Sequence, residues 1–561
     1  MKYLKKFENH SSYTEFQVTD EFIKPNVSHC VEENDVHYNP IDYSKEFLTI
    51  ESIEDENEVY FKASNSSITR TISVSTDNGK TWTEYTSSTG GSGTTIATLN
   101  SGEKALVKGE NTSYGTTSHS NYFKSTKQFE VKGNIMSLTN GDYFTDANAL
   151  AETYTFKGMF SGCTELISAD KLVLPATTLA NNCYYSMFQE CTSLTKAPEL
   201  PATTLANSCY SNMFYNCTNL TTTPQLPATA LTNYCYDSMF YRCKSLTTPP
   251  DLPATTLAES CYTSMFAQCT SLTTAPELPA MTLANYCYDS MFYGCTSLTT
   301  PPQLPATTLA YACYQTMFFS CHNLTSAPQL PATTLSDLCY DEMFRGCSKV
   351  VNAPELPATT LTAYCYDKMF YGCGLTQAPE LPATTLANSC YGGMFSYCTS
   401  LTTPPELPAT TLAYECYSGM FQGCRNLTSA PQLVATKLAE SCYSQMFTDC
   451  TSLTTAPELP ATTLAKSCYR SMFSGCKNLT AAPELLATAL KSSCYSYMFF
   501  NCSKINRIKA MFTTTPSTTY TQNWVSGVTS TGTFVKNAAA TWDVSGVNGI
   551  PTNWTVQTAT A

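Results

Sequence analysis

The chain has 561 residues, of which 13% are charged, and its formal net charge is −13 at pH 7. Lys and Arg form no cluster, which argues against a nucleic-acid or anionic-membrane partner, because both are usually reached through basic patches. No run of about 18 apolar residues occurs, so the sequence predicts no membrane span.

Residues 1–43 are predicted to be a polar leader or attachment segment. The opening MKYLKKFENHSSY has basic residues but no apolar stretch after them, unlike a secretory signal peptide. If the protein acts outside a cell, we expect it to leave by another route, such as lysis. Cys30 stands alone in this segment and indicates no site.

Residues 44–135 are predicted to form a β-sandwich-like domain. Polar and apolar residues alternate over Thr71–Ser75, and Asp77-Asn78-Gly79 is typical of a hairpin turn. The segment Ser75–Trp82 also matches the S-x-D-x-G-x-T-W Asp-box of sialidases. Sialidases carry several such boxes and clustered arginines, whereas this chain has one box and no such cluster. The hairpin interpretation is therefore favoured over an enzymatic one.

Residues 136–157 are predicted to be a linker or N-terminal cap, and a repeat array fills residues 158–502. One cysteine recurs from Cys183 to Cys494 every 26 residues, with a single step of 25 after Cys373. A second cysteine follows each of these after eight residues, and a partial copy begins at Met159. Thirteen copies at a nearly constant period predict a solenoid, which grows by stacking one repeat on the next.

Each copy is predicted to hold one short helix and one short strand. Apolar residues between Leu179 and Cys191 are spaced by 4, 1, 3, 1 and 3, which is typical of one helix stripe, with Thr177 or Thr178 as its N-cap. Thr192–Thr195 is β-prone, and Pro198 ends it. Stacked copies would thus form a short parallel sheet beside short helices.

The repeat resembles a known family. The run MFxxCTSLT followed by LPATTLA is similar to the BspA-like surface leucine-rich repeats of oral and gut bacteria, over about residues 158–502. The resemblance implies a leucine-rich-repeat solenoid that serves adhesion and host or matrix binding, with no catalysis and no cofactor. One departure is that the common L-x-x-L-x-L strand reads L-T-x-A-P-x-L here, so the strand is expected to be shorter or kinked.

The sequence has 28 cysteines, 27 of them in the repeats. Zinc sites need close C-x-x-C pairs and histidine support, which the spacing of eight does not provide. Disulfides between neighbouring copies are sterically conceivable, but no export signal accompanies them. The favoured interpretation is a ladder of small buried thiols, with no metal.

Outer positions vary between copies whereas core positions hardly change. Many outer positions carry aromatic rings, which suit contacts with sugars or proteins. The alternative is that these positions drift without constraint. The candidate ligand-binding residues are Tyr215, Tyr234, Tyr241, Tyr286, Tyr293, Tyr311, Phe319, Tyr364, Tyr371 and Tyr414.

A row of Glu, Gln or Asp follows the proline of each copy. Like charges about 4.8 Å apart repel one another, and a cation could bridge them, but a solvated edge is the favoured interpretation. The row comprises Glu199, Gln225, Asp251, Glu277, Gln303, Gln329, Glu355, Glu380, Glu406, Gln432, Glu458 and Glu484.

Residues 503–561 are predicted to be a β-rich C-terminal cap. They hold Trp524, Trp542 and Trp554 among Gly-punctuated alternating residues. The leader, the segment VKGNIMSL and the closing WVSGV…STGTF…GIP…WTV resemble proteins of gut Bacteroidales and their phages and prophages, which implies modules shared among virion-associated proteins.

The sequence therefore predicts a non-catalytic binding protein, most simply a phage tail-associated virion protein that recognises a bacterial surface glycan or protein. Its N-terminal region would contact other virion proteins, and a homo-oligomer stays open. The first alternative is a bacterial cell-surface adhesin that binds host or matrix ligands. A glycan-active enzyme is a remote alternative, since no catalytic cluster stands out from the repeats.

Overall fold

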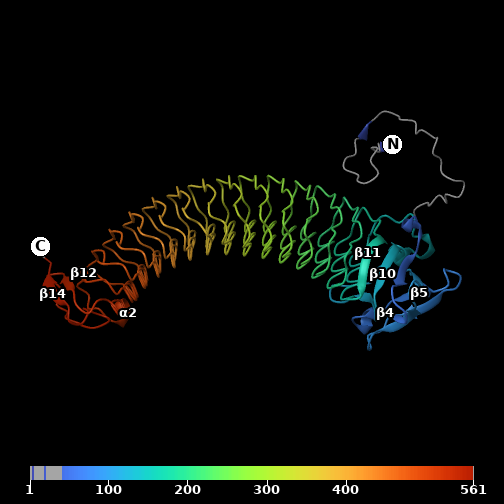
Figure 1. Ribbon diagram of the computed structural model, residues 1–561, viewed down its shortest axis with the longest axis horizontal. Coiled ribbons are helices and arrows are strands. Elements are labelled where there is room, and N and C mark those ends of the chain that lie inside the picture. The colour runs from blue at the N-terminus through green and yellow to red at the C-terminus, as the bar shows by residue number, and fades with distance from the viewer. Residues whose placement is uncertain (1–2, 5–17, 20–40, 560–561) are drawn as a thin grey trace, which may run out of the picture. The chain divides into compact units, whose positions relative to one another are not determined.

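The computed structural model describes residues 3–4, 18–19 and 41–559. Residues 1–42 form one unit, in which β1 (Tyr3–Leu4) and β2 (Val18–Thr19) pair antiparallel. Apart from these strands and residues 41–43, the predicted leader lies outside the described residues. Residues 43–561 form the second unit, which holds the sheets and the repeats (Figure 1).

The second unit begins with two β-sheets. The elements before the repeats are η1 (Tyr43–Lys45), β3 (Leu48–Ser52), β4 (Asn57–Ala63), η2 (Ser66–Ile68), β5 (Thr71–Ser75), β6 (Thr83–Thr86), β7 (Thr94–Leu99), β8 (Lys104–Lys108), β9 (Asn121–Ser125), β10 (Phe129–Asn134), α1 (Ser137–Asn140), η3 (Gly141–Tyr143) and β11 (Leu166–Val173). One sheet has the order β11-β10-β3-β8-β5-β6 and the other the order β7-β4-β9. Alternation buries Val59, Phe61 and Ala63 of β4, so one face of this strand packs into the core.

The Asp-box segment forms the turn between β5 and β6, as the hairpin interpretation predicts. The two strands pair antiparallel, and the Asp77 carboxylate accepts hydrogen bonds from the Thr81 amide at 2.9 Å and the Ser75 hydroxyl at 2.7 Å. These hydrogen bonds hold the pKa of Asp77 well below its usual range. Both carboxylate oxygens thus accept hydrogen bonds within the turn, the second one from the Thr81 hydroxyl.

The first sheet continues directly into the array. β11 pairs in parallel with β10, and the Phe156 ring stacks on Tyr184 of the first full copy, with 5.8 Å between ring centroids. Ser137 lies in the predicted linker, where its hydroxyl accepts a hydrogen bond from the Leu48 amide and donates one to the Val107 carbonyl. The buried core therefore runs unbroken from the sheets into the repeats.

The repeats form a solenoid, but the predicted helix in each copy is wrong. Within the segment predicted to be helical, every fourth residue has a left-handed backbone, as in Asn182 (φ 56°), Ser186 (φ 55°) and Glu190 (φ 62°). A right-handed helix does not tolerate this conformation. The segment is instead a run of tight turns, and no helix starts at Thr177 or Thr178.

The hydrogen bonds of the backbone amides explain this run of turns, because successive amides donate in turn within their own coil and to the next coil. The Met187 amide bonds locally to the Tyr184 carbonyl, three residues earlier, at 3.1 Å. The amides on either side of Met187 bond instead to carbonyls of the next coil. The Ser186 amide donates to the Ser211 carbonyl and the Phe188 amide to the Met213 carbonyl, each at 2.9 Å. Apolar pairs every four residues fit this geometry as well as they fit a 3.6-residue helix, so the spacing alone misled the prediction.

The predicted parallel strand is also reduced. In residues 174–506 the structure contains isolated bridges, such as Thr178 with Thr204, and no strand. The Thr221 amide and hydroxyl both bond to the Thr195 carbonyl, at 3.1 and 3.0 Å. The proline that follows in each copy, Pro224 in this one, has no amide donor, so the ladder stops after a single step.

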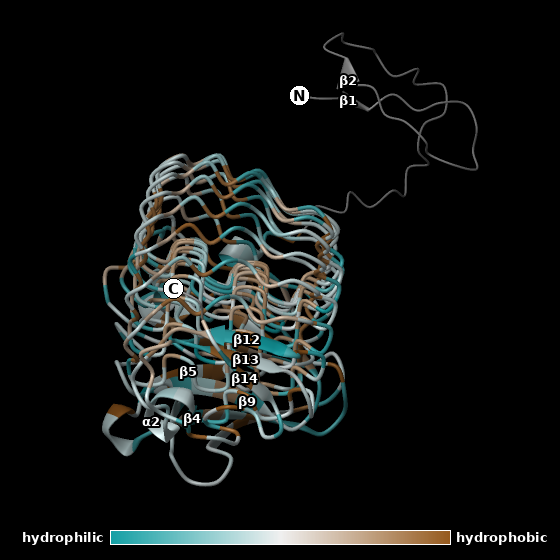
Figure 2. Ribbon diagram, turned by 90° about the vertical axis from the view of Figure 1, so that its left-hand side faces the viewer, coloured by the Kyte–Doolittle hydropathy of each residue, from teal (hydrophilic) through white to brown (hydrophobic). Residues whose placement is uncertain are grey.

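The core of the solenoid consists of ladders of identical side chains. Tyr210 stacks on Tyr236 with 5.9 Å between centroids, and Phe214 on Phe240 with 5.6 Å, and the pattern continues through the array. Figure 2 views the repeats end-on, and hydrophobic stretches recur at the same place in overlapping coils.

The repeat cysteines are buried free thiols that complete these ladders. The Cys217 thiol donates to the Phe188 carbonyl of the preceding coil at 3.0 Å, a contact repeated along the array. Burial raises the pKa of the Cys183 thiol to about 12, which disfavours the thiolate that nucleophilic or metal chemistry requires.

The C-terminal segment keeps the coil direction but forms regular strands. β12 (Arg507–Ala510), β13 (Thr533–Lys536) and β14 (Thr555–Thr558) pair in parallel, and the short α2 (Thr518–Thr521) precedes Trp524. The indole of Trp524 is buried over the end of the Phe ladder, 6.2 Å from the Phe499 ring, and donates to the Gly549 carbonyl at 2.9 Å. An end of the solenoid that would otherwise expose its core is thereby covered.

Candidate binding face

The turn runs carry the variable side chains on one surface, which we call the tyrosine face. It is defined by the ten aromatic residues predicted from the sequence and by the outer residues of the same turn runs. Tyr215 stacks on Tyr241 and Tyr293 on Phe319, each with 4.8 Å between ring centroids. The structure thus brings four of the ten together as two ring pairs, in which each ring covers a face of its neighbour.

The remaining candidate rings differ in exposure. Tyr286 and Tyr311 meet edge to face at 5.2 Å, so their rings are also partly covered. Tyr234, Tyr364 and Tyr414 are each 41% exposed, and these three are the rings most open to a ligand. Tyr371 is half-buried, and its ring centroid lies 5.1 Å from that of Tyr397.

Arginine takes the place of a ring in the same row. Arg345 occupies the position of Phe319 one coil later, and its guanidinium lies 5.3 Å from the Phe319 ring centroid and 4.5 Å from that of Tyr371. Its other contact is an ion pair with Glu342 at 2.7 Å. Cation–π contacts of this kind keep the row continuous where an aromatic residue is missing. Reasoning from the sequence missed this residue.

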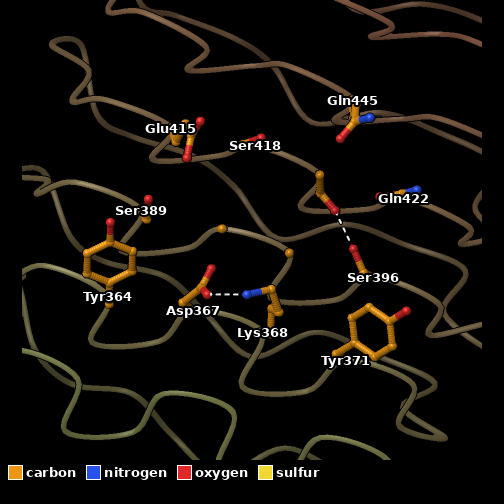
Figure 3. Close-up of a pocket in the computed structure, with 13 residues that line it drawn as sticks. Tyr364, Asp367, Lys368, Tyr371, Ser389, Ser396, Glu415, Ser418, Gln422 and Gln445 are labelled. Atoms are coloured by element: carbon orange, nitrogen blue, oxygen red, sulfur yellow. Dashed lines mark hydrogen bonds and ion pairs between the residues drawn. The ribbon is translucent and has the colours of Figure 1, made fainter. Parts of the chain in front are cut away.

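The face is hollowed where the row of large side chains ends. In the coil after Tyr364 and Tyr371, the matching positions are Ser389 and Ser396. A hollow of about 260 Å³ lies here. Figure 3 shows Tyr364 and Tyr371 on either side of an ion pair between Asp367 and Lys368. The other lining residues are Gly392, Gly393, Glu415, Ser418, Gly419, Gln422 and Gln445.

Charge in the hollow is partly neutralised. The Lys368 ammonium lies 2.7 Å from an Asp367 carboxylate oxygen and 3.6 Å from Glu342. Burial raises the pKa of Asp367, and the adjacent ammonium opposes that rise. Glu415 is half-buried at the rim and adds a second carboxylate. With two carboxylates and one ammonium, the hollow has an excess of negative charge.

Aspartates recur beneath the face at the position of Asp367. Burial raises the pKa of Asp289 to about 6 and that of Asp341 to about 7, so both titrate near neutral pH. The Gln315 side-chain amide donates to Asp341 at 2.8 Å. These groups were not among the predicted site residues, although their recurrence at one repeat position was visible in the sequence.

The sequence also carried a signal for the hollow. The copy Cys390-Tyr391-Gly392-Gly393 has glycine at both positions after the Cys-Tyr pair, where the other twelve copies have at least one side chain. Only the stacking of coils places this gap beside Tyr364 and Tyr371.

The proline edge, with its row of acids and glutamines, lies away from this hollow. Its members are exposed, and Glu484 pairs with Lys509 at 2.9 Å. Among the described residues, no group of three or more His, Cys, Asp or Glu is placed to hold a metal ion. Within the same residues, no helix is long and apolar enough to cross a membrane.

Comparison with known proteins gives one family. The family described as "BspA type Leucine rich repeat region (6 copies)" matches residues 152–273, 181–325, 313–454 and 414–525. These overlapping matches span residues 152–525, which is two thirds of the chain.

A solved structure that is similar is the "Crystal structure of TLR13-ssRNA13 complex", at 15% identity and a TM-score of 0.23. The match covers 66% of this chain and 50% of that chain. No curated protein matches the sequence.

Proposed function

The chain belongs to the BspA-type leucine-rich-repeat family, and we propose that it is a non-catalytic binding protein that holds a ligand at a surface through its tyrosine face. The observation that carries this proposal is the contrast within each turn run. The inward residues repeat almost unchanged, whereas the outward residues vary and include stacked and exposed aromatic rings.

The scaffold suits such a role. Backbone hydrogen bonds between successive coils fix each turn run, so the backbone that carries the outer side chains is already ordered before a ligand arrives. Solenoids present extended surfaces of this kind, and tyrosine and arginine are enriched in protein interfaces. Burial raises the pKa of thiols such as that of Cys183, and the Asp-box carboxylate accepts hydrogen bonds within a turn, so neither supports an enzymatic role.

The finer proposal concerns the ligand and the location. We propose a bacterial surface glycan or protein as the ligand and a phage particle as the location, supported by the resemblance of the two end segments to virion-associated modules. The second candidate is a bacterial surface adhesin for host or matrix ligands, supported by the family itself.

Removal of the stacked rings tests the face. Alanine at the four stacked positions is expected to weaken binding of the purified chain to intact bacterial cells at least about tenfold, because aromatic anchors dominate interface energies. Labelled chain and flow cytometry would measure the apparent Kd. The substituted residues are Tyr215, Tyr241, Tyr293 and Phe319.

The matched control replaces four exposed acids of the proline edge by alanine and should bind as the unchanged chain does. Binding by the ring variant at unchanged affinity would refute the stacked rings as the contact residues. A chain that binds neither bacterial cells nor immobilised matrix protein would refute the binding function itself. The control residues are Glu277, Glu355, Glu380 and Glu406.

Location separates the two candidates. Antibody-gold labelling of lysates and of intact cells is expected to place gold on tail-like particles if the phage proposal is right. Gold confined to intact cell envelopes would contradict that proposal and favour the adhesin.

A further inference from the structure

The hollow beside Tyr364 and Tyr371 is formed by missing side chains on an otherwise filled face. One position of the turn run is glycine in two successive coils, Gly393 and Gly419. The coil before them has Lys368 at this position, and the coil after them has Gln445. A Cβ at Gly393 would contact the Lys368 side chain at 3.0 Å, so Lys368 leans across the glycine coil. Side chains of the preceding coil therefore line the sides of the gap, and the backbone of the glycine coils lies at its base.

Its lining combines the rings of Tyr364 and Tyr371 with several hydrogen-bonding groups. The rows that contain Tyr364 and Tyr371 continue as Ser389 and Ser396, so the next coil places no ring at these two row positions. The Tyr397 ring of that coil, at the neighbouring position, lies 5.1 Å from the Tyr371 ring, so Tyr364 is the more open of the two. Hydroxyl, amide and carboxylate groups come from Ser418, Gln422 and Glu415 (Figure 3). A pyranose sugar could match both kinds of lining group. Its C–H groups on one face can pack on a tyrosine ring, and its hydroxyls can donate to and accept from the polar groups.

Size and charge narrow the ligand further. At about 260 Å³ the hollow lies just below the usual range of about 300–1,000 Å³ for small-molecule sites, so it suits one sugar unit. The only ammonium in its lining, that of Lys368, is already shared between Asp367 and Glu342. A carboxylate on the ligand would face Glu415 without a free cation, which is unfavourable at short range.

We propose that this hollow is a subsite for one neutral sugar unit of a surface glycan. The proposal rests on the binding function proposed above and gives it a ligand class. Contacts along the rest of the tyrosine face would position the remainder of the glycan.

A filling substitution tests the subsite with little risk to the fold. Gly419 has φ 60°, and its counterpart one coil later, Gln445, has φ 58° in the same Cys-Tyr-Ser-x-Met-Phe context. A Cβ at Gly419 would meet its nearest neighbour, the Gln422 side chain, at 3.5 Å, which is ordinary contact. Gly419→Gln should therefore fold normally and fill the hollow. Ser264→Gln, at the same repeat position (φ 53°) outside the hollow, is the matched control.

The probe is an array of defined oligosaccharides in three classes: neutral hexoses, N-acetylhexosamines, and uronic or sialic acids. The full chain is expected to bind neutral members and to leave the acidic ones unbound. Titration calorimetry with the best neutral oligosaccharide should show at least a tenfold loss of affinity for Gly419→Gln and none for Ser264→Gln. Circular dichroism would verify that both variants are folded.

Three results would overturn the subsite. They are unchanged affinity in folded Gly419→Gln, equal loss in Ser264→Gln, and preferential binding of acidic oligosaccharides. If the chain binds cells through its stacked rings but no oligosaccharide on the array, the subsite fails while the binding function stands. If the chain binds neither cells nor matrix protein, the binding function itself has failed.

Discussion

Replacing Phe318 by alanine is expected to lower the free energy of unfolding by about 3–5 kcal/mol. The ring is fully buried between Phe292 and Phe344, with centroids 5.7 and 5.5 Å away. A cavity here cannot collapse easily, because each coil is tied by backbone hydrogen bonds to its neighbours. Urea unfolding followed by circular dichroism would measure the change.

The position in the array gives this substitution a second effect. Repeat proteins gain much of their stability from contacts between neighbouring repeats. Weakening the middle of the ladder should therefore split one unfolding transition into two, or broaden it clearly.

The adjacent residue provides the control for the ladder. Phe319 is half-buried on the tyrosine face and stacks on Tyr293 alone among the rings. Phe319→Ala should cost about 1–2 kcal/mol, because it removes one stacked ring contact and the cation–π contact with Arg345 but leaves no internal cavity. Equal losses for Phe318→Ala and Phe319→Ala would contradict the assignment of Phe318 to a continuous core ladder.

Replacing Gly133 by alanine is expected to cost about 3–5 kcal/mol, which combines left-handed strain with overpacking. Gly133 lies in β10 with φ 82°, and a Cβ there would collide with the carbonyl of Phe47. The obstacle is backbone, which cannot rotate away as a side chain can. β10 would have to shift, and with it the pairing to β11 through which the sheets join the repeats.

Gly102 separates the two causes in this prediction. Its φ of 79° is nearly the same, but no atom lies within 4 Å of a Cβ built there. Gly102→Ala should therefore carry only the cost of the left-handed conformation, about 1–2 kcal/mol. Thermal and urea unfolding of both variants would measure the difference. Similar losses would show that the contact with Phe47 does not matter.

Several features followed from single copies and their repetition. The cysteine period predicted a solenoid, and the constant letters Cys183, Tyr184, Met187 and Phe188 are all fully buried. Repetition makes this inference strong, because an invariant apolar residue in a stack must meet its own copies. The variable letters were likewise expected on the outside, where Tyr234 and Tyr414 are found exposed.

The candidate site was only partly accessible in this way. The ten rings were identified, but Arg345, Asp367 and Lys368 were not. These charged side chains contact residues of neighbouring coils. The sequence of a single copy does not show which side chains of the adjacent coils lie beside it. The double glycine at Gly392 and Gly393 gave a visible signal, although its meaning depends on the coil before it.

The sequence by itself therefore determined the solenoid class, the repeat period and the division into buried and outer positions, because each depends on which residues recur. Only the tertiary structure decided the backbone of each coil. A helix closes its hydrogen bonds within a few residues, whereas half of the turn-run amides bond to the next coil, about 25 residues away. The same stacking decided which outer side chains meet and where the face is hollow.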